Sequence, residues 1–111
     1  MRIKKVPKSI VPILRELKKR LRRLYGNRLK NVVLHGSYAR GDFTSGSDID
    51  VIVVLDGLRS TCQEISRCSD ALGDLELEFD ALISILPIDA EDFEKRELPV
   101  LLTARKEGIS V

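Results

Sequence analysis

The chain has 111 residues, of which 43% are hydrophobic and 32% are charged. This length allows one modest core and little more, so we expect a single domain over residues 1 to 111. The composition excludes a disordered chain, which would lack the apolar residues that offset the entropy of ordering. No apolar run approaches the roughly 20 residues of a membrane-spanning helix, and the basic N-terminus leads into no signal-like apolar stretch. We therefore expect a cytoplasmic protein with no membrane association.

The net charge of +2 conceals a strong asymmetry along the chain. Residues 1 to 30 carry twelve Lys or Arg against Glu16 alone, whereas residues 31 to 111 carry seven basic and sixteen acidic side chains. Such a field affects encounter with partners more than it affects the fold. An acidic partner protein, an RNA or a funnel for triphosphate would each explain it. Because aromatic residues do not interleave with the cations, we rank a partner protein above a nucleic acid.

The first predicted element is an amphipathic helix over residues 9 to 25, within a basic N-terminal segment of residues 1 to 30. Apolar residues recur at helical spacing from Ile10 to Leu24, and Gly26-Asn27 ends the pattern. Pro12 is tolerated because it falls in the first turn. The side chains predicted to cover the opposite face are Lys18, Lys19, Arg20, Arg22 and Arg23.

Three strands and a second helix are predicted in the central segment, residues 31 to 86. The first strand covers residues 31 to 35 and ends at Gly36-Ser37, with one helical turn at 38 to 40 and a loop at 42 to 47. The β-branched residues at 51 to 54 predict a strand over 48 to 55. A helix over 59 to 72 is stopped by Gly73. Alternation of apolar and acidic residues then predicts a strand over 75 to 86.

The remaining elements are a helical C-terminal segment, residues 87 to 111, and two cysteines. The segment from 90 to 106 has a helical pattern divided by Pro99, and Gly108 marks its end. Cys62 and Cys68 lie six residues apart in the second predicted helix, where they point in different directions. We interpret both as reduced packing residues rather than as a disulfide or a metal pair.

The motif with the clearest chemistry is Asp48-Ile49-Asp50. Residues two apart on a strand project to one face, so both carboxylates point away from the core face that holds Ile49. Two ionised carboxylates repel each other unless a cation lies between them, which predicts a divalent metal. Oxygen ligands favour Mg²⁺ or Mn²⁺ over Zn²⁺. Asp80 has the right phase on the predicted third strand to add a further carboxylate, and Glu78 is the runner-up.

The second half of the motif is the Gly36-Ser37 turn, with ten residues between Ser37 and Asp48. A glycine permits close backbone approach, and amides at a helix start attract phosphate, to which the serine hydroxyl adds a donor. Arg40 is a candidate phosphate contact, although it could equally pair with Asp42 or Asp48. His35 is the only histidine, and we interpret it as structural rather than as a catalytic base.

These residues resemble the nucleotidyltransferase superfamily that includes DNA polymerase beta, and most closely its minimal nucleotidyltransferases. An Asp-x-Asp alone is weak, since solvated strand ends and glycosyltransferases carry it too; the added Gly-Ser turn and later aspartate make the match specific. The resemblance implies an α/β (α+β) nucleotidyltransferase fold, with a small mixed β-sheet and flanking helices. It also implies two Mg²⁺ ions held by Asp48, Asp50 and Asp80, and ATP or another nucleoside triphosphate whose pyrophosphate is cradled by Gly36 and Ser37.

Many minimal nucleotidyltransferases are the antitoxin of a paired HEPN ribonuclease toxin, and this sequence is similar to them. The resemblance implies transfer of AMP from ATP to a tyrosine hydroxyl on the toxin. Two alternatives remain open: a non-catalytic antitoxin that acts by stoichiometric binding, and a transferase for a small molecule such as an aminoglycoside. The intact aspartates argue against the first, and the lack of a second domain to shape an acceptor pocket argues against the second.

Overall fold

The computed structural model describes residues 6 to 111, so Met1 to Lys5, with three of the N-terminal cations, lie outside the described part. The first helix, α1 (Val11–Tyr25), begins two residues later than predicted and carries Pro12 in its first turn. A short 3-10 turn, η2 (Gly26–Arg28), leads into β1 (Leu29–His35). α2 (Ser37–Arg40) and β2 (Ile49–Leu55) follow as the sequence predicts.

The four strands form one mixed sheet in the order β3-β2-β1-β4. β1 and β2 are antiparallel, with His35 opposite Asp50, and β3 (Ile83–Asp89) runs parallel to β2, with Ser84 opposite Asp50. Pro87 lies on the edge strand β3, where a missing amide donor is tolerated. The predicted small mixed sheet with flanking helices is confirmed.

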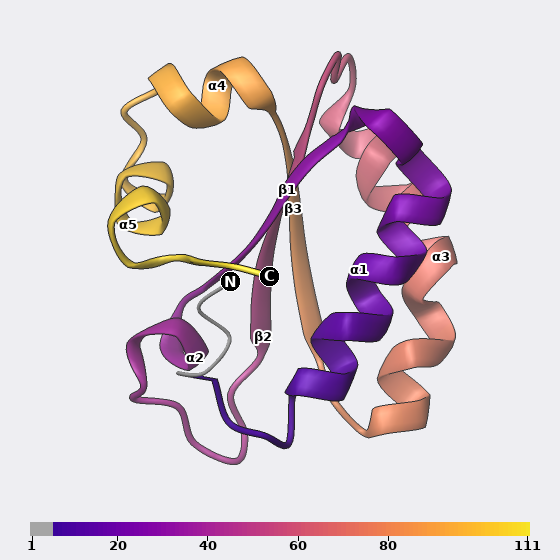
Figure 1. Ribbon diagram of the computed structural model, residues 1–111, viewed down its shortest axis with the longest axis vertical. Coiled ribbons are helices and arrows are strands. Elements are labelled where there is room, and N and C mark those ends of the chain that lie inside the picture. The colour runs from indigo at the N-terminus through magenta and orange to yellow at the C-terminus, as the bar shows by residue number, and fades with distance from the viewer. Residues whose placement is uncertain (1–5) are drawn as a thin grey trace.

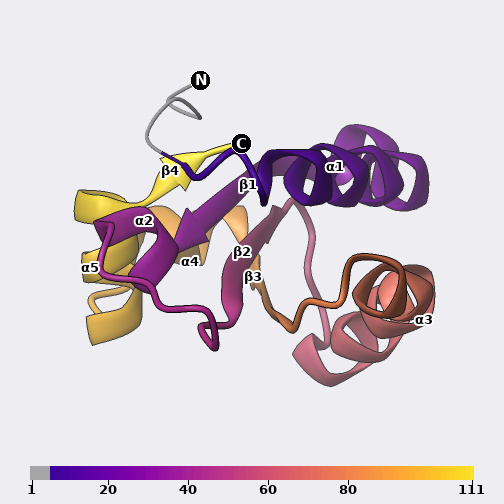
Figure 2. The same ribbon diagram turned by 90° about the horizontal axis from the view of Figure 1, so that it is seen from below.

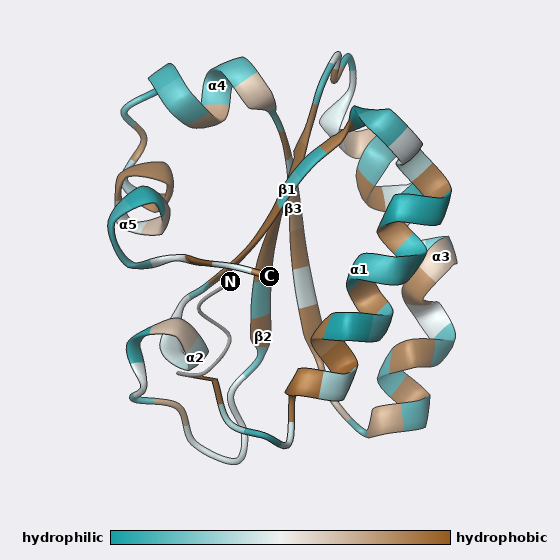
Figure 3. Cartoon of the chain, in the orientation of Figure 1, coloured by the Kyte–Doolittle hydropathy of each residue, from teal (hydrophilic) through white to brown (hydrophobic). Residues whose placement is uncertain are grey.

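Two layers of helices cover the two faces of this sheet (Figure 1). α1 and α3 (Thr61–Phe79) cover the face that carries Ile49, Val51 and Val53. α4 (Ala90–Lys95) and α5 (Pro99–Glu107) cover the face that carries Ile52 and Val54. Colouring by hydropathy shows mainly apolar strands between helices that carry both polar and apolar residues (Figure 3). β2 is therefore buried on both sides, which explains its continuous apolar run.

The second predicted helix is longer than expected, and the third strand starts eight residues later than predicted. α3 begins after an N-cap at Ser60 and continues through Gly73 to Phe79. The apolar residues of this stretch also satisfy a helical period, because Leu72 and Leu75 are buried whereas Leu77 is 86% exposed. Leucine and glutamate are strong helix formers. This propensity, together with packing against α1, outweighs the alternating pattern that predicts a strand.

The C-terminal segment is only partly helical. α4 and α5 are separated by three residues before Pro99, and α5 ends at Gly108 as predicted. The last residues form β4 (Ile109–Ser110), a two-residue strand paired with β1 that the sequence does not predict. A strand of two residues has no detectable period, and it exists because β1 offers it an edge. No helix among residues 6 to 111 combines the length and the apolar character needed to cross a membrane.

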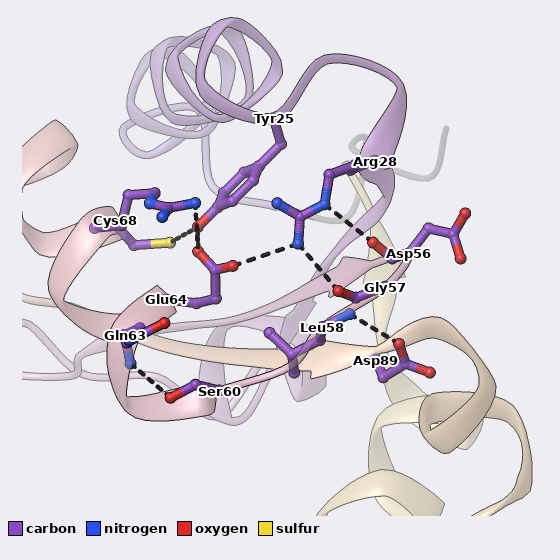
Figure 4. Close-up of polar contacts among 11 residues, drawn as sticks. Tyr25, Arg28, Asp56, Gly57, Leu58, Ser60, Gln63, Glu64, Cys68 and Asp89 are labelled. Carbon is purple, nitrogen blue, oxygen red and sulfur yellow. Dashed lines mark hydrogen bonds and ion pairs between the residues drawn. The ribbon is translucent and has the colours of Figure 1, made fainter.

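Polar contacts fasten α1 to α3 at two places. Arg20, predicted to lie on the outer face, instead reaches across to α3, where its guanidinium bonds to Asp74 and to the Ala71 carbonyl (3.3 Å). This guanidinium holds the pKa of the Asp74 carboxyl below its usual range. The second contact is centred on Glu64, the one buried charged residue of the described chain, which accepts from the Tyr25 hydroxyl at 3.0 Å (Figure 4).

Two arginines complete the Glu64 cluster. Arg28 lies 3.4 Å from one carboxylate oxygen of Glu64, and Arg67 lies 3.3 Å from the other. Cys68 is buried 3.1 Å from the Tyr25 hydroxyl, and burial raises the pKa of its thiol, which makes it an unreactive packing residue. Cys62 is exposed, so the interpretation of both cysteines as packing residues is wrong for Cys62.

Replacement of Gly73 by alanine tests the helical assignment. A Cβ at Gly73 meets nothing within 4 Å, so we expect Gly73→Ala to stabilise the protein by about 0.5 to 1 kcal/mol. The matched control is Gly26→Ala: this glycine is equally open but has φ +57°, so alanine there should cost about 1 kcal/mol. Urea unfolding measures both. Destabilisation by Gly73→Ala would contradict a helix through this position.

Candidate active site

The predicted site residues gather at one end of the sheet, at the bottom of Figure 1. β1 ends there and β2 and β3 begin there, because β1 runs antiparallel to both. α2 and the loop before β2 lie at the same end, as the view from below shows (Figure 2). Antiparallel pairing thus brings together residues that are more than ten positions apart in the sequence.

Asp48 and Asp50 lie at the start of β2. Asp50 pairs with His35 on β1 and has the phase of Ile52, whereas Ile49 and Val51 pack in the opposite core. The register therefore confirms that the Asp50 carboxylate turns away from the Ile49 face. Asp48 directly precedes β2, so the register does not fix the direction of its side chain. Asp48 is exposed and Asp50 is partly buried, so both can meet a ligand from solvent.

Gly36 lies directly against the Asp50 carboxylate. Its φ is +73°, in the left-handed region that favours glycine, and a Cβ built there would collide with Oδ2 of Asp50. The glycine therefore has two functions: it turns the chain from β1 into α2, and it leaves the space that the carboxylate occupies. Ser37 is the first residue of α2, where the backbone amides have no helical partner and are free to meet an anion.

His35 stands opposite Asp50, half-buried at the end of β1. Burial lowers the pKa of its imidazole, the Asp50 carboxylate acts in the opposite direction, and Arg40 adds to the lowering. The ring is therefore held toward its neutral form beside the carboxylate. This arrangement supports the interpretation of His35 as a structural neighbour of Asp50.

Asp80 is at the same end of the sheet but not on a strand. It is the exposed C-cap of α3, with φ +50°, and it precedes β3. Two residues later, the Leu82 carbonyl accepts a hydrogen bond from the Ile49 amide (2.8 Å), which fixes this segment beside the start of β2. Glu78, the runner-up, lies on α3 with an oxygen 4.0 Å from Arg20 and is thereby turned toward α1.

Arg40 and two aromatic residues shape the loop between the two halves of the motif. Of the two partners left open for Arg40, the structure selects Asp42, to which its Nε donates at 3.2 Å. The rings of Tyr38 and Phe43 stack with centroids 4.7 Å apart. This stack folds the loop back onto α2, and the sequence analysis does not predict it. A pair of aromatic residues flanking Gly41 in an otherwise small and polar stretch could have indicated the stack.

The donor set fits Mg²⁺ shared with a ligand better than a closed protein site. Residues 6 to 111 contain no group of three or more His, Cys, Asp or Glu side chains placed to hold a metal ion. Mg²⁺ is usually held by one or two carboxylates together with substrate phosphates and water. Asp48 and Asp50 supply such a pair, and the Gly36-Ser37 turn beside Asp50 is where phosphate oxygens would meet them.

Comparison with known proteins gives the following similarities. Residues 14 to 101 match the model of the family described as nucleotidyltransferase domain. Two Methanocaldococcus jannaschii proteins, each named "Putative protein adenylyltransferase", are similar to this chain. One is 35% identical over 76 residues, 68% of this chain and 76% of that protein. The other is 32% identical over 83 residues, 75% of this chain and 77% of that protein.

Solved structures share the fold at lower identity. A nucleotidyltransferase structure from Sulfolobus solfataricus superposes with a TM-score of 0.66 at 18% identity, over 94% of this chain and 86% of that one. A toxin-antitoxin complex with AMP-PNP gives 0.59 at 20% identity, over 86% and 69%. A mutant of the toxin-antitoxin MntA-HpeT gives 0.57 at 23% identity, over 88% and 70%.

Substitution of Gly36 tests its contact with Asp50. Gly41 is a control for positive φ, since its φ is +93° and its Cβ position has open space around it; its ψ of 3° differs from the −153° of Gly36. We expect Gly41→Ala to cost about 1 to 2 kcal/mol from backbone strain alone. Gly36→Ala should cost a further 1 to 3 kcal/mol, roughly, because the methyl group must displace the carboxylate and because ψ −153° is less accessible to alanine than the ψ of Gly41. Urea unfolding measures both, and equal losses would show that the contact is absent in solution.

Proposed function

The chain belongs to the nucleotidyltransferase domain family, and from this premise we propose that it transfers AMP from ATP to a hydroxyl group of a partner protein. The observation that carries the proposal is the close packing of Gly36 against the Asp50 carboxylate. The proposal assigns phosphate binding to the Gly36-Ser37 turn and metal binding to Asp50, and this contact puts the two side by side. The adenylyltransferase names of the two M. jannaschii relatives support AMP as the transferred group.

In this reaction the acceptor oxygen forms a bond to the α-phosphorus of ATP, and the bond from that phosphorus to the pyrophosphate oxygen breaks. Backbone amides at Gly36 and Ser37, with the serine hydroxyl, hold the departing pyrophosphate. Asp48 and Asp50 would hold Mg²⁺, which would neutralise phosphate charge and acidify the acceptor hydroxyl. The Asp80 carboxylate would receive the hydroxyl proton and help to hold a second Mg²⁺. Mn²⁺ suits the same oxygen ligands.

We propose that the partner is a HEPN-type toxin and that this chain is its antitoxin, acting in the cytoplasm. Two structures that share the fold are toxin-antitoxin complexes, which supports a toxin partner. The exposed side of α1 supplies a docking surface for an acidic protein. We define this basic α1 face by four side chains that recur at helical spacing and form no ion pair within residues 6 to 111: Arg15, Lys18, Lys19 and Arg22.

Removal of the carboxylate charges at the start of β2 tests catalysis. We expect Asp48→Asn with Asp50→Asn to lower transfer from labelled ATP to the partner by roughly a hundredfold or more, because metal-assisted charge stabilisation is worth several kcal/mol. Asp56→Asn, an exposed aspartate just beyond the other end of β2, is the control and should keep full activity.

The same variant separates catalysis from stoichiometric binding. If the doubly altered protein still protects cells fully from the toxin, then the antitoxin acts by binding and the catalytic proposal fails. If label instead appears on an added aminoglycoside and never on the partner, the acceptor is a small molecule. Magnesium removal by EDTA should abolish labelling of the partner.

Charge reversal on the basic α1 face tests the docking surface. We expect Arg15→Glu, Lys19→Glu and Arg22→Glu together to weaken association with the partner at least about tenfold at low salt, with a smaller loss at high salt, since exposed charges are screened. The control applies the same change of charge to the exposed Lys95, Arg96 and Lys106 beside α4 and α5. Equal losses for both triple variants in a salt series would exclude a specific face.

A further inference from the structure

The loop between α2 and β2, residues 41 to 48, is tied to the core by an aromatic pair, and we call it the α2–β2 loop. The ring of Phe43 stacks on that of Tyr38, with centroids 4.7 Å apart and planes 14° apart. Tyr38 belongs to α2 and packs against the core cluster that α1 and α3 cover. The stack therefore connects an exposed loop to a part of the molecule whose position is fixed.

A hydrogen-bonded turn closes the second half of the α2–β2 loop. The Thr44 amide donates to Oγ of Ser47 at 2.8 Å, and the Ser47 amide donates to the Thr44 carbonyl at 3.0 Å. Beyond Asp48, the Ile49 amide donates to the Leu82 carbonyl at 2.8 Å, which joins the start of β2 to the chain before β3. The residue before Asp48 and the residue after it are thus both held by hydrogen bonds.

These contacts connect the two halves of the motif. Tyr38 follows Ser37 in α2, and Phe43, which stacks on Tyr38, directly precedes the turn that ends before Asp48. The register of β1 with β2 fixes Asp50 but not Asp48, because Asp48 precedes the strand. The position of the Asp48 carboxylate therefore depends on the conformation of the α2–β2 loop.

The aromatic pair affects the loop more than the fold. Phe43 is 39% exposed and belongs to neither core cluster of residues 6 to 111. A side chain that is only partly removed from water contributes little to burial of apolar surface. A loop of small and polar residues has many conformations of similar energy, and a stacked aromatic pair offsets part of the entropy lost on ordering it. Removal of the ring should therefore free the loop without unfolding the protein.

We propose that Phe43 is a positioning residue for Asp48: by stacking on Tyr38 it holds the α2–β2 loop in the conformation that keeps the Asp48 carboxylate in place beside Asp50. This inference rests on the proposed function, in which Asp48 and Asp50 hold Mg²⁺. A metal ligand binds more tightly when neighbouring groups fix its orientation, and loss of such a neighbour typically lowers metal affinity roughly 10- to 100-fold. Phe43 itself contacts neither the metal nor the nucleotide in this scheme.

The test compares two substitutions of Phe43 in the full chain by calorimetric titration with Mg²⁺ in the presence of AMP-PNP. We expect Phe43→Ala to weaken Mg²⁺ binding about tenfold, because the loop loses its contact with α2. Phe43→Tyr retains the stacked ring and should bind Mg²⁺ as tightly as the unaltered protein. Leu98→Ala is the matched control, since Leu98 is also a large apolar residue exposed to 40%, but lies at the start of α5. It should have no effect.

Three further measurements on Phe43→Ala separate positioning from a general loss of structure. Its urea unfolding midpoint should equal that of the unaltered protein. In the ¹⁵N-labelled variant, the Ser47 amide should exchange its hydrogen with solvent faster, because its bond to the Thr44 carbonyl opens more often. AMP-PNP should still shift the amide signals of Gly36 and Ser37, since that turn does not depend on the loop.

Each other result has a defined meaning. Mg²⁺ affinity that is unchanged in Phe43→Ala, or equally weakened in Phe43→Tyr or Leu98→Ala, would overturn the inference. A lowered unfolding midpoint or lost AMP-PNP shifts in Phe43→Ala would overturn it too, because the ring would then support the fold as a whole. Asp48→Asn is the reference: if it binds Mg²⁺ as tightly as the unaltered protein, the proposed function fails. If Asp48→Asn loses binding and Phe43→Ala does not, only the positioning role fails.

Discussion

The antiparallel pairing of β1 with β2 is the constraint on which the site depends. It places His35 opposite Asp50, and the turn that follows His35 then brings Gly36 under the Asp50 carboxylate. Both strands are held in this register by their buried faces, since a slip of one residue would move every apolar side chain to the wrong layer. The positions of His35, Gly36 and Asp50 at the end of the sheet are therefore fixed by the packing of the buried part of β2, which helices cover on both faces.

The sequence predicts this part of the molecule well because the relevant physics is local. Asp48 and Asp50 share a face by the two-residue period of a strand, and Gly36-Ser37 marks a turn by its chemistry. The strand predicted over Leu75 to Phe79 is wrong because these residues fit both the two-residue period of a strand and the 3.6-residue period of a helix. Only burial against α1 decides between the two. Asp80 consequently occupies a helix cap, and both metal binding by Asp48 and Asp50 and the contribution of Asp80 to it stay predictions.

Long-range contacts account for the remaining differences. Arg20 follows the polar side of a helical pattern, yet α3 supplies Asp74 as a partner 54 residues away, which no local pattern can indicate. The same applies to Glu64, which is buried because Tyr25, Arg28 and Arg67 converge on it from two elements. β4 depends on an available edge of β1. In each case the contact is made with a residue of another element, which is too far away in the sequence for a periodic pattern to indicate it.

The lack of a cationic partner for Asp48 and Asp50 helps to distinguish a catalytic site from an inactive site in a protein that acts only by binding. Asp48 and Asp50 form no ion pair with any residue from 6 to 111, and the neutral tendency of His35 leaves Asp50 without a cationic neighbour on β1. Asp50 lies on the face of β2 opposite Ile49 and Asp48 directly precedes the strand, so the two carboxylates are close in the sequence without a paired cation among residues 6 to 111. Gly36 adds a backbone entropy cost at the same point. The catalytic proposal requires a carboxylate packed against a glycine turn, whereas stoichiometric binding of a partner gives no reason for that contact.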